Sequence, residues 1–263
     1  MQNSNQYDLY NRHYSRVGNA LPHWNEAIAD PKRFASTAPW LPENKEAKIL
    51  DFGCGWGHQL MALWCAGYKN IEGVEISNDQ AEICRREAKG LFPVFNSDGR
   101  AFLKNVKDAY DFIVLNDVLE HLTVAEAKET LTLIHQSLKP AGTVVIRTPN
   151  MASLLSSFSM RIDITHITGY TEFSIQQILD LSGFENHRFI ASQWRINLRS
   201  WRPWAPWRGF CLKLLCNILI HKFLYLLRGQ APHASIFDYN LTIYSQKAET
   251  RSDATSTRNF AGE

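Results

Sequence analysis

Two acids and two histidines have the side chains and the spacing for proton or metal chemistry. Two segments hold them, Asp117-Val118-Leu119-Glu120-His121 after an apolar run, and Asp163-Ile164-Thr165-His166 further along. Either His121 or His166 could act as a general base that removes a proton from a hydroxyl. Alternatively, Asp117, Glu120, His121 and His166 could together bind a divalent metal that acidifies a substrate oxygen. A structural role is also open, in which Glu120 and His121 only cap the next helix or order the rim.

A glycine-rich segment upstream has the pattern of a ligand-binding turn. It reads ILDFGCGWGH from Ile49 to His58, an apolar run that ends in an acid and continues into three glycines at alternate positions. Glycine lets the chain bend sharply and lets a ligand lie against bare backbone. A dinucleotide fingerprint requires G-x-G-x-x-G/A. Neither Gly53 nor Gly55 begins one, because His58 and Leu60 hold the sixth positions. The pattern is D-x-G-x-G-x-G.

Polar residues also close the next three strands predicted along the chain. Glu75 and Ile76 end the segment NIEGVEI, where the Glu75 carboxylate can accept from two ribose hydroxyls. Asp98 and Gly99 follow the third strand, and the Asp98 carboxylate can accept from an adenine amino group. Asn116 ends the fourth strand. Because parallel strands bind ligands beyond their carboxyl ends, these residues predict a nucleoside site at one edge of a sheet.

Apolar runs and helix caps predict the elements that would position these residues. Strands are expected over Ala47–Phe52, Asn70–Ile76, Pro93–Asn96, Tyr110–Asn116, Thr143–Thr148, Glu185–Ser192 and Phe237–Tyr244, with a turn over Lys139–Gly142. Helices are expected over Gln59–Ala66, from a Ser77/Gln80 capping box to Ala88, from a Thr123/Glu126 capping box to Leu138, and over Phe173–Leu181. Strands separated by helices imply right-handed crossovers and a parallel sheet.

We therefore predict an α/β, Rossmann-like, doubly wound fold. Its mostly parallel, seven-stranded sheet would have helices on both faces and a helical insertion before the last strand. The expected domains are an N-terminal helical cap or arm at 1–46, the core at 47–192, the insertion at 193–233, the final strand at 234–247 and a disordered tail at 248–263. The N-terminal segment would hold helices over Tyr7–Arg16 and Trp24–Phe34.

Bulk composition narrows the class of protein. The chain has 263 residues, enough for one large α/β domain with an insertion. Its net charge of +2 gives no global field that would favour nucleic acid. The five cysteines form no C-x-x-C pair, which indicates reduced thiols in a cytosol rather than a disulfide framework. The polar N-terminus has no apolar segment of a signal peptide, so we expect a cytoplasmic protein.

Five segments together resemble the class I S-adenosylmethionine (SAM) methyltransferases. They are ILDFGCGWG, GVEIS, NSDG, YDFIVLNDVLEHL and LKPAGTVVIRTPN, and the resemblance covers residues 47–190. It implies that SAM is bound by Asp51, Gly53, Cys54, Gly55, Gly57, Glu75, Ile76, Asp98, Gly99 and Asn116. In such enzymes SAM carries the reactive sulfonium, and the protein aligns a nucleophile behind its methyl group.

The acid-x-x-Glu-His pattern with a later histidine resembles a narrower group. This is the magnesium-dependent O-methyltransferases of ubiquinone synthesis and of small-RNA 3′ ends. There the metal binds two vicinal oxygens of the substrate and acidifies one of them. The resemblance implies that Mg²⁺ is held by Asp117, Glu120, His121 and His166. This chain departs from the group in carrying Asp117 where those enzymes usually have glutamate.

An aromatic and basic insertion follows the predicted core. Residues 193–209 read QWRINLRSWRPWAPWRG, and an apolar segment, FCLKLLCNILIHKFLYLLRG, comes next. Lys213, Asn217 and His221 recur every four residues, which predicts an amphipathic helix rather than a membrane span. Tryptophan and arginine beside such a helix suit a membrane interface over residues 194–228. They also suit a substrate lid, a dimer surface or a helix packed on the sheet.

The segment DITHITGYTEFSIQQILDLSGFE resembles methyltransferases encoded among bacterial surface-polysaccharide genes. This implies a SAM-dependent O-methyltransferase for a sugar hydroxyl in a glycan or lipid-linked polysaccharide, peripheral at the inner membrane face. A quinone-type phenol or another small-molecule hydroxyl is the second choice of acceptor. RNA 3′ ends come third, because the weak net charge counts against nucleic acid. A non-catalytic SAM-binding regulatory subunit is the alternative from another class, and the intact acid–histidine rim favours the enzyme.

Overall fold

The computed structural model describes residues 37–153, 156–190 and 238–249, together with 219–220, 222–223, 226–227 and 236. Three predictions fall on other residues and so lie outside the described part of the chain. They concern the helices of the N-terminal segment, the tryptophan- and arginine-rich part of the insertion, and the tail beyond residue 249. At the described positions between 219 and 227 the backbone is helical.

Seven strands form a single sheet in the order β3-β2-β1-β4-β5-β7-β6. They are β1 (Ile49–Phe52), β2 (Ile71–Glu75), β3 (Val94–Asn96), β4 (Tyr110–Asn116), β5 (Leu138–Pro149), β6 (Phe184–Phe189) and β7 (Asn240–Lys247). Strands β1 to β5 pair in parallel, and β7 lies antiparallel between β5 and β6. The prediction of a mostly parallel, seven-stranded α/β sheet is confirmed. The strand order reverses between β1 and β4, which creates a crevice beyond their carboxyl ends.

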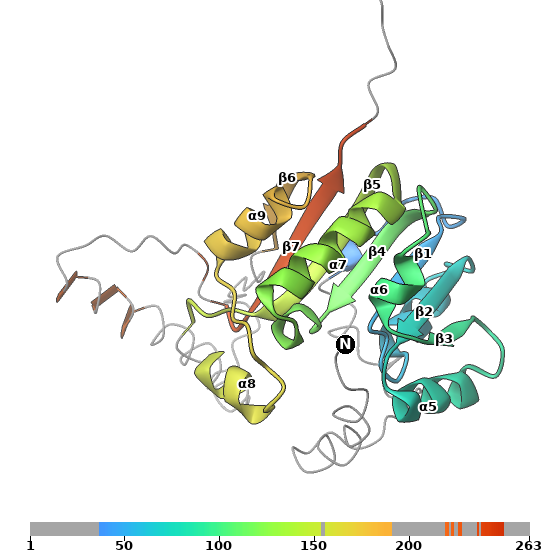
Figure 1. Ribbon diagram of the computed structural model, residues 1–263, viewed down its shortest axis with the longest axis horizontal. Coiled ribbons are helices and arrows are strands. Elements are labelled where there is room, and N and C mark those ends of the chain that lie inside the picture. Colours follow the sequence, from blue (N-terminus) through green and yellow to red (C-terminus); the bar gives the residue numbers. More distant parts are fainter. Residues whose placement is uncertain are drawn as a thin grey trace, which may run out of the picture.

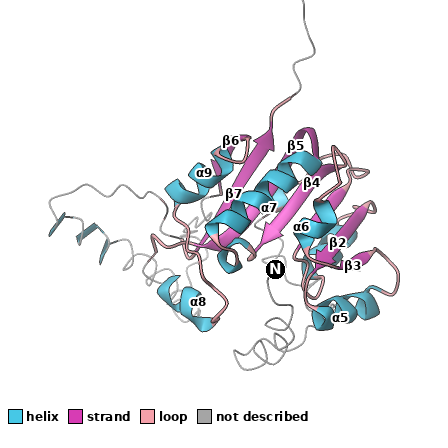
Figure 2. Cartoon of the chain, in the orientation of Figure 1, coloured by secondary structure: helices cyan, strands magenta, loops and turns pink. Residues whose placement is uncertain are grey.

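Helices cover both faces of this sheet (Figures 1 and 2). They are α4 (His58–Cys65), α5 (Asn78–Ala88), α6 (Gly99–Leu103), α7 (Val124–Ser137), α8 (Ser156–Ile162) and α9 (Glu172–Asp180), with 3₁₀ helices η2 (Ala38–Trp40) and η3 (Leu119–His121). Successive strand side chains point to opposite faces. Leu50 and Ile113 therefore pack in one buried cluster with residues of α7 and α9. Ile49 and Phe112 pack in the other, with residues of α4 and α5. Each such side chain contributes about 1.5–3 kcal/mol by burial.

Residue patterns in the sequence predicted most helix and strand ends to within one or two residues of their positions in the structure. β4 has the predicted bounds. The predicted capping box at the start of α7 is complete, because Thr123 accepts from the Glu126 backbone and the Glu126 side chain accepts from Thr123. At α5 only half of the predicted box exists. Ser77 accepts from the backbone of Gln80, but its own N–H donates to Glu75. This leaves the Gln80 side chain for the cavity described below.

The predicted starts of β5 and β7 are wrong, and tertiary pairing explains both. In addition, β6 ends at Phe189 rather than Ser192, and β7 ends at Lys247 rather than Tyr244. The turn predicted over Lys139–Gly142 is an irregular part of β5, where the register with β4 shifts and Ala141 has a φ of +61°. The final strand begins at Asn240 rather than Phe237. The Asn150 side-chain amide donates to the carbonyls of Ile236 and Asp238, both at 2.9 Å, so these residues bend before the strand begins.

Candidate functional site

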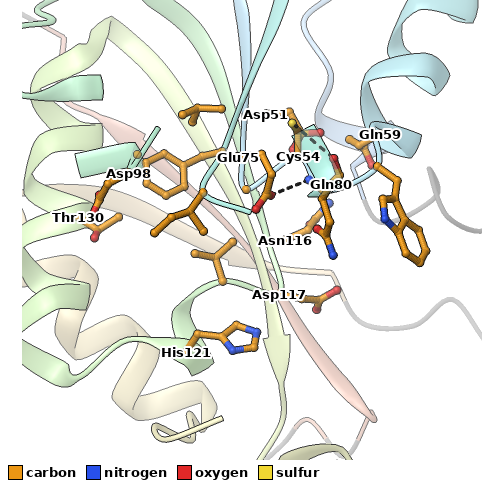
Figure 3. Close-up of a pocket in the computed structure, with 18 of the residues that line it drawn as sticks. Asp51, Cys54, Gln59, Glu75, Gln80, Asp98, Asn116, Asp117, His121 and Thr130 are labelled. Atoms are coloured by element: carbon orange, nitrogen blue, oxygen red, sulfur yellow. Dashed lines mark hydrogen bonds between the residues drawn. The ribbon is translucent and has the colours of Figure 1, made fainter. Parts of the chain in front are cut away.

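A cavity of about 390 Å³ opens at the carboxyl ends of β1, β2 and β4 (Figure 3). All of the predicted cofactor residues line it except Gly57, which is the N-cap of α4. Asp117 and His121 also line it, at one edge in Figure 3, whereas Glu120 and His166 are not among its lining residues. Nine of the ten predicted cofactor residues therefore lie at one cavity, although they form less than half of its wall.

The glycine loop has a backbone that only glycine adopts readily. Gly53, Gly55 and Gly57 have φ angles of +76°, +52° and +83°. Gly53 also lacks room for a side chain, because a Cβ there would lie 2.6 Å from Cγ2 of Val118. The backbone N–H groups of Gly53 and Cys54 both donate to the Val74 carbonyl, at 2.8 and 3.1 Å. The loop is thus tied to the end of β2 and lies flat against the cavity.

Glu75 is held at the centre of the cavity by two backbone donors. The Gly55 N–H donates to Oε2 at 2.9 Å, and the Ser77 N–H donates to Oε1 at 2.8 Å. Burial raises the pKa of the carboxyl, and the backbone hydrogen bonds offset part of that rise. A carboxylate offers about four acceptor positions, so Glu75 keeps acceptor capacity beyond its backbone hydrogen bonds. That is the requirement for binding a pair of neighbouring hydroxyls.

Asp51 and Asn116 are buried acceptors at the ends of β1 and β4. Oδ2 of Asp51 and Oδ1 of Asn116 have no hydrogen-bond partner within the described part of the chain. Burial and the nearby Glu75 raise the pKa of Asp51 to about 7, and Arg147 counteracts them in part. Because buried polar groups almost always find partners, these two atoms indicate a ligand that brings donors into the cavity.

Asp98 and Gly99 form the wall at the end of β3. Asp98 caps α6, accepting from the Arg100 backbone at 2.8 Å and from its guanidinium Nη2 at 3.1 Å. Burial alone would raise the pKa of Asp98, but the hydrogen bonds and charge of Arg100 lower it below its usual range. A Cβ at Gly99 would lie 2.1 Å from Cζ of Phe52, so only glycine allows this contact.

Asp117 is paired with Arg147, a residue that the sequence did not single out. The Asp117 N–H donates to the Arg147 carbonyl at 2.8 Å, and the Arg147 guanidinium donates to the Asp117 carboxylate, with Nε 3.1 Å from Oδ1. Asp117 has a φ of +54°, in the left-handed region that aspartate adopts more readily than most residues. In the sequence, the one sign of this pair is that Arg147 is the single charged residue in the predicted strand TVVIRT.

Glu120, His121 and His166 converge beside the cavity. One potential ligand atom from each lies within 4.8 Å of the others, and the two imidazole centroids are 4.5 Å apart. Asp117 is not part of this group. Of the four predicted metal ligands, the structure brings three together and pairs the fourth with Arg147. Neither Glu120 nor His121 is the N-cap of α7, which is Thr123.

Hydrogen bonds at Nδ1 orient both imidazoles. The Thr165 hydroxyl donates to Oδ1 of Asp163 at 2.6 Å, and its oxygen lies 2.8 Å from Nδ1 of His121. Nδ1 of His166 donates to the Ser159 carbonyl at 2.8 Å. Because a carbonyl only accepts, a neutral His166 carries its acceptor lone pair on Nε2, and His121 is oriented by Thr165 through Nδ1. Such support from neighbouring groups is typical of histidines that bind metals.

Glu120 is held in place from two sides. The Thr148 hydroxyl donates to its Oε2 at 3.1 Å, and the backbone N–H groups of Ile167 and Thr168 donate to its carbonyl at 2.8 and 3.1 Å. Burial, and then the charge of Asp117, raise its pKa. Burial and the neighbouring His166 lower the pKa of His121 to about 4. Carboxylate oxygen and imidazole nitrogen are ligands that proteins use for divalent cations, so these three side chains form a candidate cation site.

Comparison with known proteins identifies the family. The sequence profile of a family described as a methyltransferase domain matches residues 22–188, more than half of the chain. The chain belongs to this methyltransferase family. Among solved structures, a SAM-dependent methyltransferase from Archaeoglobus fulgidus is similar with a TM-score of 0.61 and 21% identity, over 92% of this chain and 98% of that one. The fold is thus that of the class I SAM-dependent methyltransferases.

Other relatives of the methyltransferase cover less or differ in activity. An uncharacterised methyltransferase of Oceanobacillus iheyensis is 32% identical over 39% of this chain and 47% of its own length. The cyclopropane-fatty-acyl-phospholipid synthase of Escherichia coli K12 is 26% identical over 54% of this chain and 39% of its own. The chain thus spans half or less of these curated relatives. The [4+2]-cyclase SpnF has the same fold, with a TM-score of 0.59 and 15% identity over 94% of this chain and 96% of that one.

The cavity of the methyltransferase fits SAM, the cofactor that the family implies. SAM brings a sulfonium, an ammonium and ribose hydroxyls. Four acids line the cavity (Asp51, Glu75, Asp98 and Asp117), and the two arginines that line it each pair with an acid. Glu75 has acceptor capacity for the ribose, and Asp51 has an unpartnered buried oxygen for a donor. A cationic, donor-rich ligand satisfies both groups.

Several lining residues were missed as members of this site. They include Trp56, Gln59, Gln80, Arg100, Thr130 and Arg147. The sequence pattern marks Gln80 only as a helix-cap residue, yet its Oε1 would lie 3.3 Å from a Cβ at Gly55. It therefore lies over the glycine loop. No local pattern marks such residues, because helix and turn positions become lining residues only through the tertiary arrangement.

Asp51 is expected to make the cofactor-free methyltransferase less stable as the pH rises. Its pKa of about 7 in the folded state exceeds the ordinary value of 3.8, so the unfolded chain ionises first. The free energy of unfolding should fall from about pH 4 to about pH 7 and stay low above that, by up to about 4 kcal/mol from this group. Asp51→Asn should remove this component and be more stable than the wild type at pH 8. Urea unfolding at pH 5 and 8 measures it, and an unchanged pH profile in the variant would contradict the assignment.

Proposed function

We propose that this methyltransferase transfers the methyl group of SAM to a hydroxyl of a sugar in a glycan or lipid-linked polysaccharide. The observation that carries the O-methylation is the Glu120, His121 and His166 cluster beside the cofactor cavity. A hydroxyl is a weak nucleophile until its proton is removed or its oxygen is polarised. The cluster offers the groups for that task at the edge of the cavity where His121 lies.

The residues of the cavity have separate roles in this proposal. SAM supplies an electrophilic methyl group on its sulfonium when it is bound. Glu75 binds the ribose hydroxyls, Asp51 and Asn116 accept from the amino-acid end, and the wall around Asp98 faces the adenine. The glycine loop admits the cofactor against its backbone. These residues fix the methyl group in position, and the alignment itself lowers the barrier.

Polarisation by a metal is favoured over general-base catalysis by His121. An efficient general base has a pKa near the working pH. His121 has a pKa of about 4, so it is neutral at pH 7 but binds a proton weakly. A neutral imidazole with its lone pair on Nε2 is the form that binds metals. Glu120, His121 and His166 would hold the ion, which would lower the pKa of the acceptor hydroxyl. Imidazole suits Zn²⁺ and Fe²⁺, while Mg²⁺ prefers oxygen, so several ions must be tried.

A sugar acceptor is supported by the sequence of the insertion. Its alternating tryptophan and arginine residues suit stacking on sugar rings and contacts to hydroxyls or phosphates. The Escherichia coli relative is a cyclopropane-fatty-acyl-phospholipid synthase, and this likeness supports a lipid-borne acceptor. No helix among the described residues is long and apolar enough to cross a membrane. We therefore propose a cytoplasmic protein that contacts the inner membrane surface through residues 194–228.

The proposed acceptor can be tested with methyl-labelled SAM. Purified protein is incubated with the host's extracted glycolipids, soluble glycans, quinones and RNA, each in a separate reaction. We expect label in the glycolipid or glycan fraction, stable to mild alkali because methyl ethers, unlike esters, resist it. The Gly55→Arg variant, whose side chain would enter the cavity beside Gln80, serves as the blank. Label in the quinone or RNA fraction would refute the sugar assignment. Binding of SAM without any labelled product would favour a regulatory subunit.

A further inference from the structure

Helix α8 has its polar and apolar faces reversed for a surface helix. Its buried residues are Ser156, Ser159 and Met160, whereas Phe158 is 67% exposed and Ile162 is 36% exposed. A helix that packs on a core normally turns its apolar side inward. Here Ser156 donates to the Tyr239 carbonyl at 3.1 Å, and Ser159 bonds to the Tyr239 hydroxyl. The inward face is thus held by hydrogen bonds from two serines, with Met160 as its one buried apolar side chain, while Phe158 and Ile162 are exposed.

The apolar surface continues into the loop that carries His166. Ile164 is 96% exposed and Ile167 is 56% exposed, on either side of this candidate metal ligand. We call Phe158, Ile162, Ile164 and Ile167 the apolar rim. Figure 1 shows α8 at the periphery of the molecule, away from the helices that cover the sheet. Neighbouring exposed apolar residues of this kind mark a surface that binds something.

The segment that returns to α8 has an unusual charge. No Asp or Glu occurs between Glu185 and Asp238, while this stretch has eight basic residues: Arg188, Arg195, Arg199, Arg202, Arg208, Lys213, Lys222 and Arg228. The whole chain has 28 basic and 26 acidic residues, so the rest of it carries 20 against 26, a formal charge of −6. The near-neutral total therefore conceals one strongly cationic segment. Cationic segments are attracted to anionic surfaces.

This acid-free segment leaves and re-enters the fold at the edge of the sheet where α8 lies. It leaves after β6, where the Ile190 N–H donates to the Thr242 carbonyl at 2.9 Å. It returns at β7, whose first residue Asn240 is opposite Pro149 at the end of β5. The cavity opens at the same carboxyl edge. The apolar rim, both ends of the cationic segment and the cavity therefore share one side of the molecule.

Described residues within the segment show the same exposure of apolar side chains. Leu219, Ile220, Phe223, Leu226 and Leu227 are all exposed, and their spacing places them on one face of a helix. The Lys222 side chain is exposed as well. An apolar face beside cationic residues is the pattern of a helix that lies in a membrane interface.

We propose that the apolar rim docks on a lipid bilayer and turns the candidate site toward the membrane surface, and the cationic composition of the chain between Glu185 and Asp238 makes an anionic bilayer the occupant that fits. This inference rests on the proposed function, because it makes the acceptor a lipid-borne hydroxyl presented at the bilayer. A second copy of the chain fits less well, since two acid-free segments would repel each other. An RNA fits the charge, but the aliphatic side chains of the rim suit acyl chains better than phosphates and bases.

Vesicle flotation with the full chain tests this surface. The probes are vesicles of phosphatidylglycerol and phosphatidylethanolamine, against vesicles of phosphatidylcholine alone. We expect the wild type to float with the anionic vesicles and to be released by high salt. The double variant Phe158→Asp/Ile164→Asp should lower the bound fraction about tenfold, since it replaces apolar contacts by charges that an anionic surface repels. Leu181→Asp is the matched control, because Leu181 is 61% exposed at the end of α9, outside the apolar rim, and should leave flotation unchanged.

SAM binding, measured by calorimetry, should be equal in all three proteins, which shows that the variants are folded.

Flotation needs neither SAM nor acceptor, so it can fail while methyl transfer succeeds, and the two proposals fail separately. Wild type that stays in the soluble fraction would overturn the docking proposal, as would a double variant that floats like the wild type. A shift from dimer to monomer in the double variant would assign the rim to self-association instead. Wild type that binds RNA but does not float with the anionic vesicles would overturn the docking proposal and assign the cationic segment to nucleic acid.

Discussion

Replacing Gly53 with alanine is expected to abolish measurable SAM binding and to lower the free energy of unfolding by about 3 kcal/mol. The backbone φ of +76° is unfavourable for alanine, and the new Cβ would lie 2.6 Å from Cγ2 of Val118. Val118 is itself part of the cavity wall, on the stretch that follows β4. Relief of the clash must move either the glycine loop or that stretch, and both contact the cofactor in our assignment. Calorimetric titration with SAM and urea unfolding measure the two effects.

Gly90→Ala separates backbone strain from the clash. Gly90 has a φ of +81°, close to that of Gly53, but nothing lies within 4 Å of the position of its Cβ. It follows α5 and does not line the cavity. This variant should lose about 1 kcal/mol of stability through the backbone alone. Its affinity for SAM should equal that of the wild type. If Gly53→Ala binds SAM within threefold of the wild type, the glycine loop is not the cofactor site.

The cavity could be predicted from the sequence because its signals are local. The glycines need positive φ, and that need is written in their residue type and spacing. Asp51, Glu75 and Asn116 each end an apolar run, and parallel strands bring their carboxyl ends to one edge. Once the runs were recognised as strands, these side chains had to meet. The same reasoning placed β4 and the α7 cap without any knowledge of the tertiary structure.

The surroundings of Asp117, Glu120, His121 and His166 could not be predicted from such local sequence signals. Asp117 and Arg147 lie on different strands, and their pairing depends on the register of β4 with β5. The sequence therefore offered Asp117 as a metal ligand, and only the fold shows that its carboxylate has another partner. The ring orientations of His121 and His166 likewise depend on Thr165 and Ser159. Those contacts form when the loop after α8 packs against η3, which no periodicity encodes.

Divalent metal is expected to raise the melting temperature of the wild type and to leave that of His166→Ala unchanged. An ion that binds only the folded state stabilises it by about 2.7 kcal/mol at a concentration of 100 Kd. Mg²⁺, Mn²⁺ and Zn²⁺ are titrated separately into chelator-treated protein. Thr165→Val should lower the affinity about 10–100-fold, because Thr165 orients His121 without contacting the ion. His135→Ala, on α7 beside Phe184, is the matched histidine control and should respond like the wild type.

Glu120→Gln distinguishes a metal site from a structural cluster by the sign of its effect. Without metal the wild type holds a buried carboxyl whose pKa is raised by burial and by the charge of Asp117. Glutamine keeps the shape and the hydrogen bond from Thr148 but removes the acid, so the metal-free variant should be at least as stable as the wild type. Saturating metal should reverse this order, because only the wild type has the anionic ligand. A variant that is less stable than the wild type by the same amount with and without metal would mean that Glu120 is structural and that the hydroxyl is activated by other groups.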